Sequence, residues 1–96
     1  MNSNIPPKRL KFSLGRMIVT DGAREALSNF DIVLALVRHG IGDWGDLDEE
    51  DLARNERALI SGGRLVSAHS SRAHVMFYVI TESDRSTTTV LLAHEY

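Results

Sequence analysis

Five residues in the last third of the chain have the types that ribonuclease chemistry uses. Histidine can exchange a proton with a ribose hydroxyl or a leaving oxygen, while arginine, threonine and tyrosine can hold a phosphate. On one sheet face they would supply an acid, a base and a phosphate clamp. The alternative is structural, with histidines flanking a turn and an arginine at a hairpin beside a β-prone threonine strand. The set is His69, His74, Tyr78, Arg85 and Thr87.

The two histidines depend on the register of one hairpin. If residues 70–73 form a four-residue turn, His69 lies opposite His74 with about 5 Å between their Cβ atoms. Two imidazoles are too few for a metal site by themselves, and a one-residue shift separates them. The sequence also lacks cysteine, a glycine-rich phosphate loop and a nucleophile elbow. We therefore predict no metal and no cofactor, with this pair as the only metal candidates.

Segment 42–56 is a second candidate site, because it holds the only tryptophan and seven of the thirteen acidic residues. It lacks the ligand order of a calcium loop. Asp48 followed by three acidic residues is typical of a helix start. Trp44 is either an anchor for a protein partner or a residue that closes the core. The predicted protein contacts are Asp43, Trp44, Asp46, Glu49, Glu50, Tyr78 and Arg85.

The elements that must position these residues form an α+β domain. A short strand at 15–20 precedes a helix from Asp21 to about Asn29, with Thr20 as N-cap. Asp31 is predicted to cap a second helix, 32–39, which is apolar almost all round and so expected to be the central buried element. A Schellman ending is predicted at Gly40. The third helix starts at Asp48 and stops at Gly62.

Three antiparallel strands are predicted to follow, at 64–69, 75–81 and 86–92. Four-residue turns would place His69 opposite His74, and Thr81 opposite Ser86. Side-chain alternation then defines a core face and a mixed second face that is expected to contact something. The core set is Val66, Ala68, Val75, Phe77, Val79, Val90 and Leu92, and the mixed set is Leu65, Ser67, His69, His74, Met76, Tyr78, Ile80, Thr87, Thr89 and Leu91.

Composition limits the class of protein. Ninety-six residues with 43% hydrophobic content suit one small domain, and no apolar run approaches the ~20 residues that cross a bilayer. The absence of cysteine fits the cytoplasm. Residues 1–16 carry a net charge of +4 and residues 17–96 carry −6. We predict a flexible basic arm at 1–14 and one domain at 15–96; the arm's basic run is too short to indicate nucleic acid binding.

Four segments resemble a family of short bacterial proteins of plasmids and phages. They are Gly42 to Asp51, Asn55-Glu56, Gly62 to Leu65, and Ile80 to Leu92, and the resemblance covers about residues 15–96. It implies a mobile-element context rather than a chemistry. The leading hypothesis is a non-enzymatic protein-binding protein, of the anti-CRISPR or anti-restriction type. The alternatives are a ribonuclease-like toxin and a homodimeric scaffold that uses the second sheet face.

Overall fold

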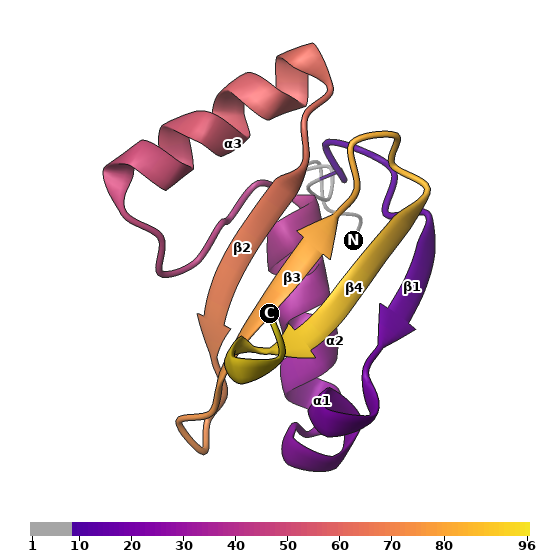
Figure 1. The fold of residues 1–96 in the computed structure, drawn as a ribbon, viewed down its shortest axis with the longest axis vertical. Coiled ribbons are helices and arrows are strands. Elements are labelled where there is room, and N and C mark those ends of the chain that lie inside the picture. Colours follow the sequence, from indigo (N-terminus) through magenta and orange to yellow (C-terminus); the bar gives the residue numbers. More distant parts are fainter. Residues whose placement is uncertain (1–8) are drawn as a thin grey trace, which may run out of the picture.

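A four-stranded mixed sheet of order β1-β4-β3-β2 organises the chain in the computed structural model, which describes residues 9–96 (Figure 1). The α+β class is confirmed, but the sheet has four strands rather than the predicted three, because the early strand joins it. Residues 1–8 of the predicted arm lie outside the described residues. The elements are β1 (Arg16–Val19), α1 (Asp21–Ala26), α2 (Asn29–Gly40), α3 (Glu49–Ser61), β2 (Leu65–Ser70), β3 (Met76–Thr81), β4 (Thr87–Leu92) and the 3₁₀ turn η1 (Ala93–Glu95).

The helix starts follow from side-chain caps. Thr20 and Asp48 accept the backbone N–H groups of Ala23 and Asp51, as predicted. The second helix begins earlier than predicted, because Ser28 rather than Asp31 caps it. As a result α1 ends at Ala26 and is only six residues long.

The helix ends depend on glycines in the left-handed region. Gly62, with φ of 88°, ends α3 as predicted. The predicted Schellman glycine of α2 is wrong: Gly40 is helical, and Gly42 takes the left-handed position with φ of 85°. The N–H groups of Gly42 and Asp43 donate to the carbonyls of His39 and Arg38, which is the Schellman pattern two residues later.

The predicted register of the first hairpin is wrong. His69 pairs with Phe77, not with His74. The connection is longer than four residues, because the N–H of Ser71 donates to the carbonyl of Val75 and His74 adopts a φ of 66° within the loop. An odd shift of pairing exchanges the two faces of a strand. Leu65, Ser67 and His69 therefore lie on the face predicted for Val66 and Ala68.

The second hairpin shifts by an even number of residues, so its side chains keep the predicted faces. Thr81 pairs with Thr88 instead of Ser86. The turn contains Arg85 in the left-handed region, with φ of 62°. The strands β3 and β4 thus present Phe77, Val79 and Val90 to the core, as predicted.

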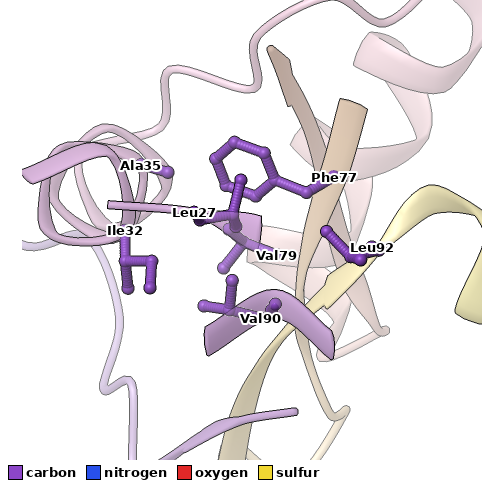
Figure 2. Packing of buried hydrophobic residues seen from close by; sticks show 8 residues of the cluster. Leu27, Ile32, Ala35, Phe77, Val79, Val90 and Leu92 are labelled. Carbon is purple, nitrogen blue, oxygen red and sulfur yellow. The ribbon is translucent and has the colours of Figure 1, made fainter. Parts of the chain in front are cut away.

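The main core lies between this face, here called the helix-side face, and the helices α1 and α2 (Figure 2). Its buried side chains are Ala23, Leu27, Ile32, Ala35, Phe77, Val79, Val90 and Leu92. A second cluster joins Trp44 to Ala58 and Leu65, with Phe12 packed against it. The described part of the predicted arm therefore contacts the body of the protein. In residues 9–96 no helix has the length and apolarity to cross a membrane.

The two edges of the sheet differ. The loop at Trp44–Asp46 pairs with the outer edge of β2 through Ala68, and the Asn55 side chain of α3 bonds both the N–H and the carbonyl of Val66. Figure 1 shows α3 beside β2 accordingly. The strand β1 pairs only with β4, in parallel, and its other edge is unpaired within residues 9–96. One edge is therefore covered and the other is open.

Candidate functional site

The five residues considered for ribonuclease chemistry do not form one site. His69 is buried on the helix-side face, whereas Tyr78 and Thr87 lie on the second face. His74 is exposed in the first hairpin loop, and Arg85 lies in the turn between β3 and β4. The proposed histidine pair is absent, and within residues 9–96 no group of three potential ligands could hold a metal ion.

A buried polar network is the feature that sequence reasoning missed. Ser67 lies between the two histidines, 2.6 Å from Nδ1 of His39 and 2.8 Å from Nε2 of His69. Nε2 of His39 lies 2.9 Å from Oγ1 of Thr81, which contacts Thr88 at 2.7 Å. The hydroxyl of Thr88 donates to the carbonyl of Leu14 at 2.6 Å. Five hydrogen bonds thus connect β2, α2, β3 and β4 with the segment before β1.

The last bond fixes the direction of all the others. The hydroxyl of Thr88 has one proton, which it donates to the carbonyl of Leu14, so it must accept a hydrogen bond from the hydroxyl of Thr81. The Thr81 hydroxyl must then accept a hydrogen bond from Nε2–H of His39. Nδ1 of His39 accepts from Ser67, which accepts Nε2–H of His69. The series of hydrogen bonds ends at Nδ1 of His69, a buried acceptor that has no hydrogen-bond partner among residues 9–96.

This network is structural rather than catalytic. His39 and Ser67 are fully buried, and His69 is 2% exposed, so no substrate can reach them. Burial lowers the pKa of His39 to about 3 and that of His69 to about 4. Both imidazoles are neutral near pH 7, which agrees with the single direction of the hydrogen bonds. The sequence signal was limited to five polar residues, which lie within a helix and three strands that are otherwise largely apolar.

Trp44 is a core residue, with 3% of its surface exposed. Its ring stacks against Phe12 and meets His39 edge to face, and its indole N–H donates to Glu56 at 2.7 Å. The ring supports the acidic loop from within. A protein-contact role for the loop stays a prediction, and its acidic side chains rather than the ring would make the contact.

The predicted acidic contacts lie at the surface. Asp43 forms an ion pair with Arg38 at 2.8 Å, and this hydrogen bond lowers the pKa of the Asp43 carboxyl. Asp46, Glu49 and Glu50 are exposed along the loop and the first turn of α3. The result is a negatively charged corner at the start of α3.

Arg85, another predicted protein contact, forms its hydrogen bonds within the protein. Its guanidinium donates to the carbonyls of Ala58, Gly63, Glu82 and Ser83, at 2.6–3.3 Å. It also lies over the ring of Phe12, 5.6 Å from the centroid. Arg85 therefore ties the end of α3 to the second hairpin, and its main interactions are intramolecular.

The second sheet face carries a cavity of about 230 Å³ next to Tyr78. Tyr96, just after η1, packs on Tyr78, and Arg64 lies over the Tyr96 ring. The Asn55 side chain on its wall donates one hydrogen bond to Val66 of β2 and accepts another from it. The described lining combines a carboxylate, two arginines and two tyrosine rings around apolar side chains. The lining residues are Leu47, Asp51, Arg54, Asn55, Arg64, Val66, Tyr78 and Tyr96.

The outer face of α2 is the largest departure from the sequence prediction. The helix was expected to be buried all round, but only Ile32, Ala35, His39 and Gly40 are buried. Phe30, Val33, Leu34 and Val37 are 58%, 58%, 44% and 49% exposed. Their spacing of three and four residues places them on one side of the helix, opposite the sheet. This group is here called the α2 stripe.

The charged groups around the α2 stripe are held by ion pairs. Arg72 bonds Asp31 at 3.3 Å and lies over the Phe30 ring, 4.7 Å from its centroid. Arg38 is paired with Asp43 near the other end of the helix. An apolar centre with a polar margin is the usual anatomy of a protein-binding site.

Neither family models nor curated proteins nor solved structures gave a match to this chain. The fold and the surfaces described above are therefore the basis for assigning a function.

Proposed function

We propose that this protein is a non-enzymatic protein-binding domain that docks through the α2 stripe. The observation that carries the proposal is the exposure of four large apolar side chains on the solvent side of a single helix. Scattered exposed apolar residues are normal, whereas a continuous apolar group on one helix is a mark of an interaction site. A partner with an apolar groove would receive the helix at Phe30, Val33, Leu34 and Val37.

The expected energy of this contact is substantial. Fully burying a valine, leucine or phenylalanine contributes roughly 1.5–3 kcal/mol. Since about half of each side chain in the stripe is exposed, covering all four would contribute roughly 3–6 kcal/mol before the costs of association. That contribution suits a central apolar anchor inside a larger interface.

We propose further that the partner is a host defence nuclease, and that the protein inhibits it. Two features support this. Segments 42–51 and 80–92 resemble those of a family of short bacterial proteins that is common on mobile elements, and the corner at Asp46, Glu49 and Glu50 is negatively charged. Nucleases bind nucleic acid through basic surfaces, which attract such a corner. The acidic corner would steer the encounter and the α2 stripe would hold it.

A plasmid-transformation assay in a host with an active restriction or CRISPR nuclease tests both parts. The unmodified protein should raise transformation, and Val33→Glu should abolish the effect because it places a charge in the stripe. Ile60→Glu is the matched control, since Ile60 is 91% exposed on α3 and lies outside the stripe. Loss of rescue with Ile60→Glu, or full rescue with a folded Val33→Glu, would exclude the α2 stripe. No rescue by the unmodified protein would exclude the nuclease partner.

A further inference from the structure

The open edge of β1 presents unpaired backbone groups. Within residues 9–96 it is the one sheet edge that nothing covers, because the loop at Trp44–Asp46 and the Asn55 side chain protect β2. Native proteins usually protect strand edges with charge, proline or a covering segment. Here β1 has a single charged side chain, Arg16, and the next two side chains leave apolar surface at the edge, since Met17 is 57% and Ile18 is 39% exposed.

The direction of the free groups follows from the hydrogen bonds to β4. The N–H of Arg16 donates to the carbonyl of Ser86 at 2.9 Å, and the N–H of Thr20 donates to that of Val90 at 3.1 Å. Backbone groups alternate in direction along a strand, so Ile18 also points to β4. The N–H and carbonyl groups of Met17 and Val19 therefore point outward.

We propose that a second copy of the chain covers this edge, with the two β1 strands antiparallel about a two-fold axis. The outward N–H and carbonyl groups of Met17 and Val19, two positions apart, can pair with the same groups of an antiparallel second copy. Met17 would exchange both backbone bonds with Val19 of the second copy, and Val19 with Met17, giving four hydrogen bonds. Ile18 would lie on the axis, facing its own copy. The sheet would become eight-stranded.

The side chains fit this register. Parallel pairing of Met17 with Thr88 and Ile18 with Thr89 places Met17 on the helix-side face and Ile18 on the second face. Each Met17 would then lie beside Val19 of the second copy on the helix-side face. Each Ile18 would meet Ile18 in a non-hydrogen-bonded pair, where side chains are closest.

Charge complementarity supports a second copy as the occupant. Arg16 makes no ion pair with any residue of 9–96, and in this register it lies opposite Thr20 of the second copy. The hydroxyl of Thr20 donates to the carboxylate of Glu95 at 2.8 Å. The guanidinium of each chain therefore meets a fixed carboxylate of the other, twice per dimer.

The proposed interface does not use the α2 stripe, so it goes beyond the proposed function and can fail independently of it. The contact is small, with four backbone bonds and a few apolar side chains, and should be a weak association. We expect half of the chains to be dimeric at a protein concentration on the order of 10–100 µM.

Disulfide cross-linking tests the register, since the natural chain has no cysteine. Ile18→Cys places two thiols across the axis at a distance that a disulfide can bridge. Under mild oxidation it should form a covalent dimer at least tenfold faster than Met17→Cys, whose thiols lie diagonally, and Ile60→Cys, whose thiol is exposed on α3. Equal rates for Ile18→Cys and Ile60→Cys would overturn the proposal, as would faster cross-linking of Met17→Cys.

Sedimentation of the full chain tests the edge itself. The unmodified protein should approach twice its chain mass of 10.7 kDa as concentration rises, and Met17→Val should do the same. Met17→Pro should stay monomeric with unchanged circular dichroism, because it removes an outward N–H and no bond to β4. A monomer at 200 µM, or a dimer of Met17→Pro, would overturn the proposal. The proposal would also be overturned if β1 bound a strand of a different protein but not a second copy of this chain.

Discussion

At the level of single residues, the main feature of this protein is a set of polar side chains buried between α2 and the sheet. Ser67, His39, Thr81 and Thr88 are all fully buried, and in this order each is hydrogen-bonded to the next. A network in which every member is satisfied fixes one arrangement of the core, whereas an unsatisfied group costs about 1–3 kcal/mol. In the part of the chain that the structure describes, Nδ1 of His69 is the one buried side-chain atom left without a hydrogen bond.

The unfolding free energy should fall as the pH drops below about 6.5. Unfolded histidines take up a proton near pH 6.5, whereas the folded state holds the pKa of His39 at about 3 and that of His69 at about 4. Acid therefore favours unfolding, by about 2 kcal/mol per histidine at pH 5 relative to pH 7. Urea titrations at several pH values measure the slope.

Two variants provide the comparison for this pH dependence. His69→Gln should remove about half of the slope between pH 6.5 and 5, since one of two buried histidines is lost. Ile60→Gln should leave it unchanged, because Ile60 has no titratable group and is 91% exposed. An unchanged slope in His69→Gln would show that His69 is not a source of the acid sensitivity.

Arg85 should be far more important than its turn position suggests. Arg85→Ala should lower the unfolding free energy by about 3 kcal/mol, because it removes a charged donor from the carbonyls of Ala58 and Gly63. Arg85→Lys should recover only part of this, since an ammonium lacks the planar fork. Thermal unfolding of both, beside the exposed Arg57→Ala, measures the effect. A loss below 0.5 kcal/mol for Arg85→Ala would contradict the tie between α3 and the hairpin.

Among the elements, the loop between α2 and α3 has the most specific task, since its backbone covers the outer edge of β2. Gly45 makes this possible: a Cβ there would lie 1.9 Å from the carbonyl oxygen of Ala68, and its φ is 72°. The neighbouring Trp44 and Asp46 form the hydrogen bonds to Ala68. The loop is therefore structural in its backbone and charged at its surface.

Gly45→Ala and Gly62→Ala form a matched pair for this loop. Both glycines have positive φ, so each alanine should cost about 1–2 kcal/mol through backbone strain. Gly62 has open space around its Cβ position, whereas Gly45 has none. Gly45→Ala should therefore cost at least twice as much as Gly62→Ala in denaturant titrations. Equal costs would mean that the loop can move away from β2 freely.

At the scale of the whole molecule, the sheet is stabilised from its middle outward. The strands β3 and β4 each have two neighbours, β2 is covered by the loop and α3, and β1 has one neighbour. Amide exchange in dilute solution should therefore be slowest in β3 and β4. In β1 the amide of Ile18 should be protected, while those of Met17 and Val19 exchange rapidly. Equal protection of all three in the monomer would contradict the assigned direction of β1.

Local signals made much of this fold predictable. The caps at Thr20 and Asp48 and the stop at Gly62 are decided by residues within one turn of the helix end, so the sequence displays them. The face of β2 was not predictable, because it depends on one extra-long turn with His74 in a conformation that glycine or asparagine normally adopts. An odd shift there moved His69 from the surface to the core.

Long-range features were also beyond the sequence. Pairing of β1 with β4 has no local signature, and α2 looks apolar all round whether or not a second layer covers it. Trp44 had two open interpretations, and the structure places it in the core. The buried histidine of α2, His39, was hidden by the same uniform apolar pattern.

The pairing of β1 with β4 also determines when the protein can finish folding. Arg16 pairs with Thr87, 71 positions later, so β1 must wait for a strand that is synthesised well after it. Until β4 leaves the ribosome, β1 has no strand to pair with. Long-separation pairing of this kind is slow and exposes apolar surface during synthesis. Nascent chains truncated before residue 87 should therefore be bound by chaperones, and full-length chains should be released.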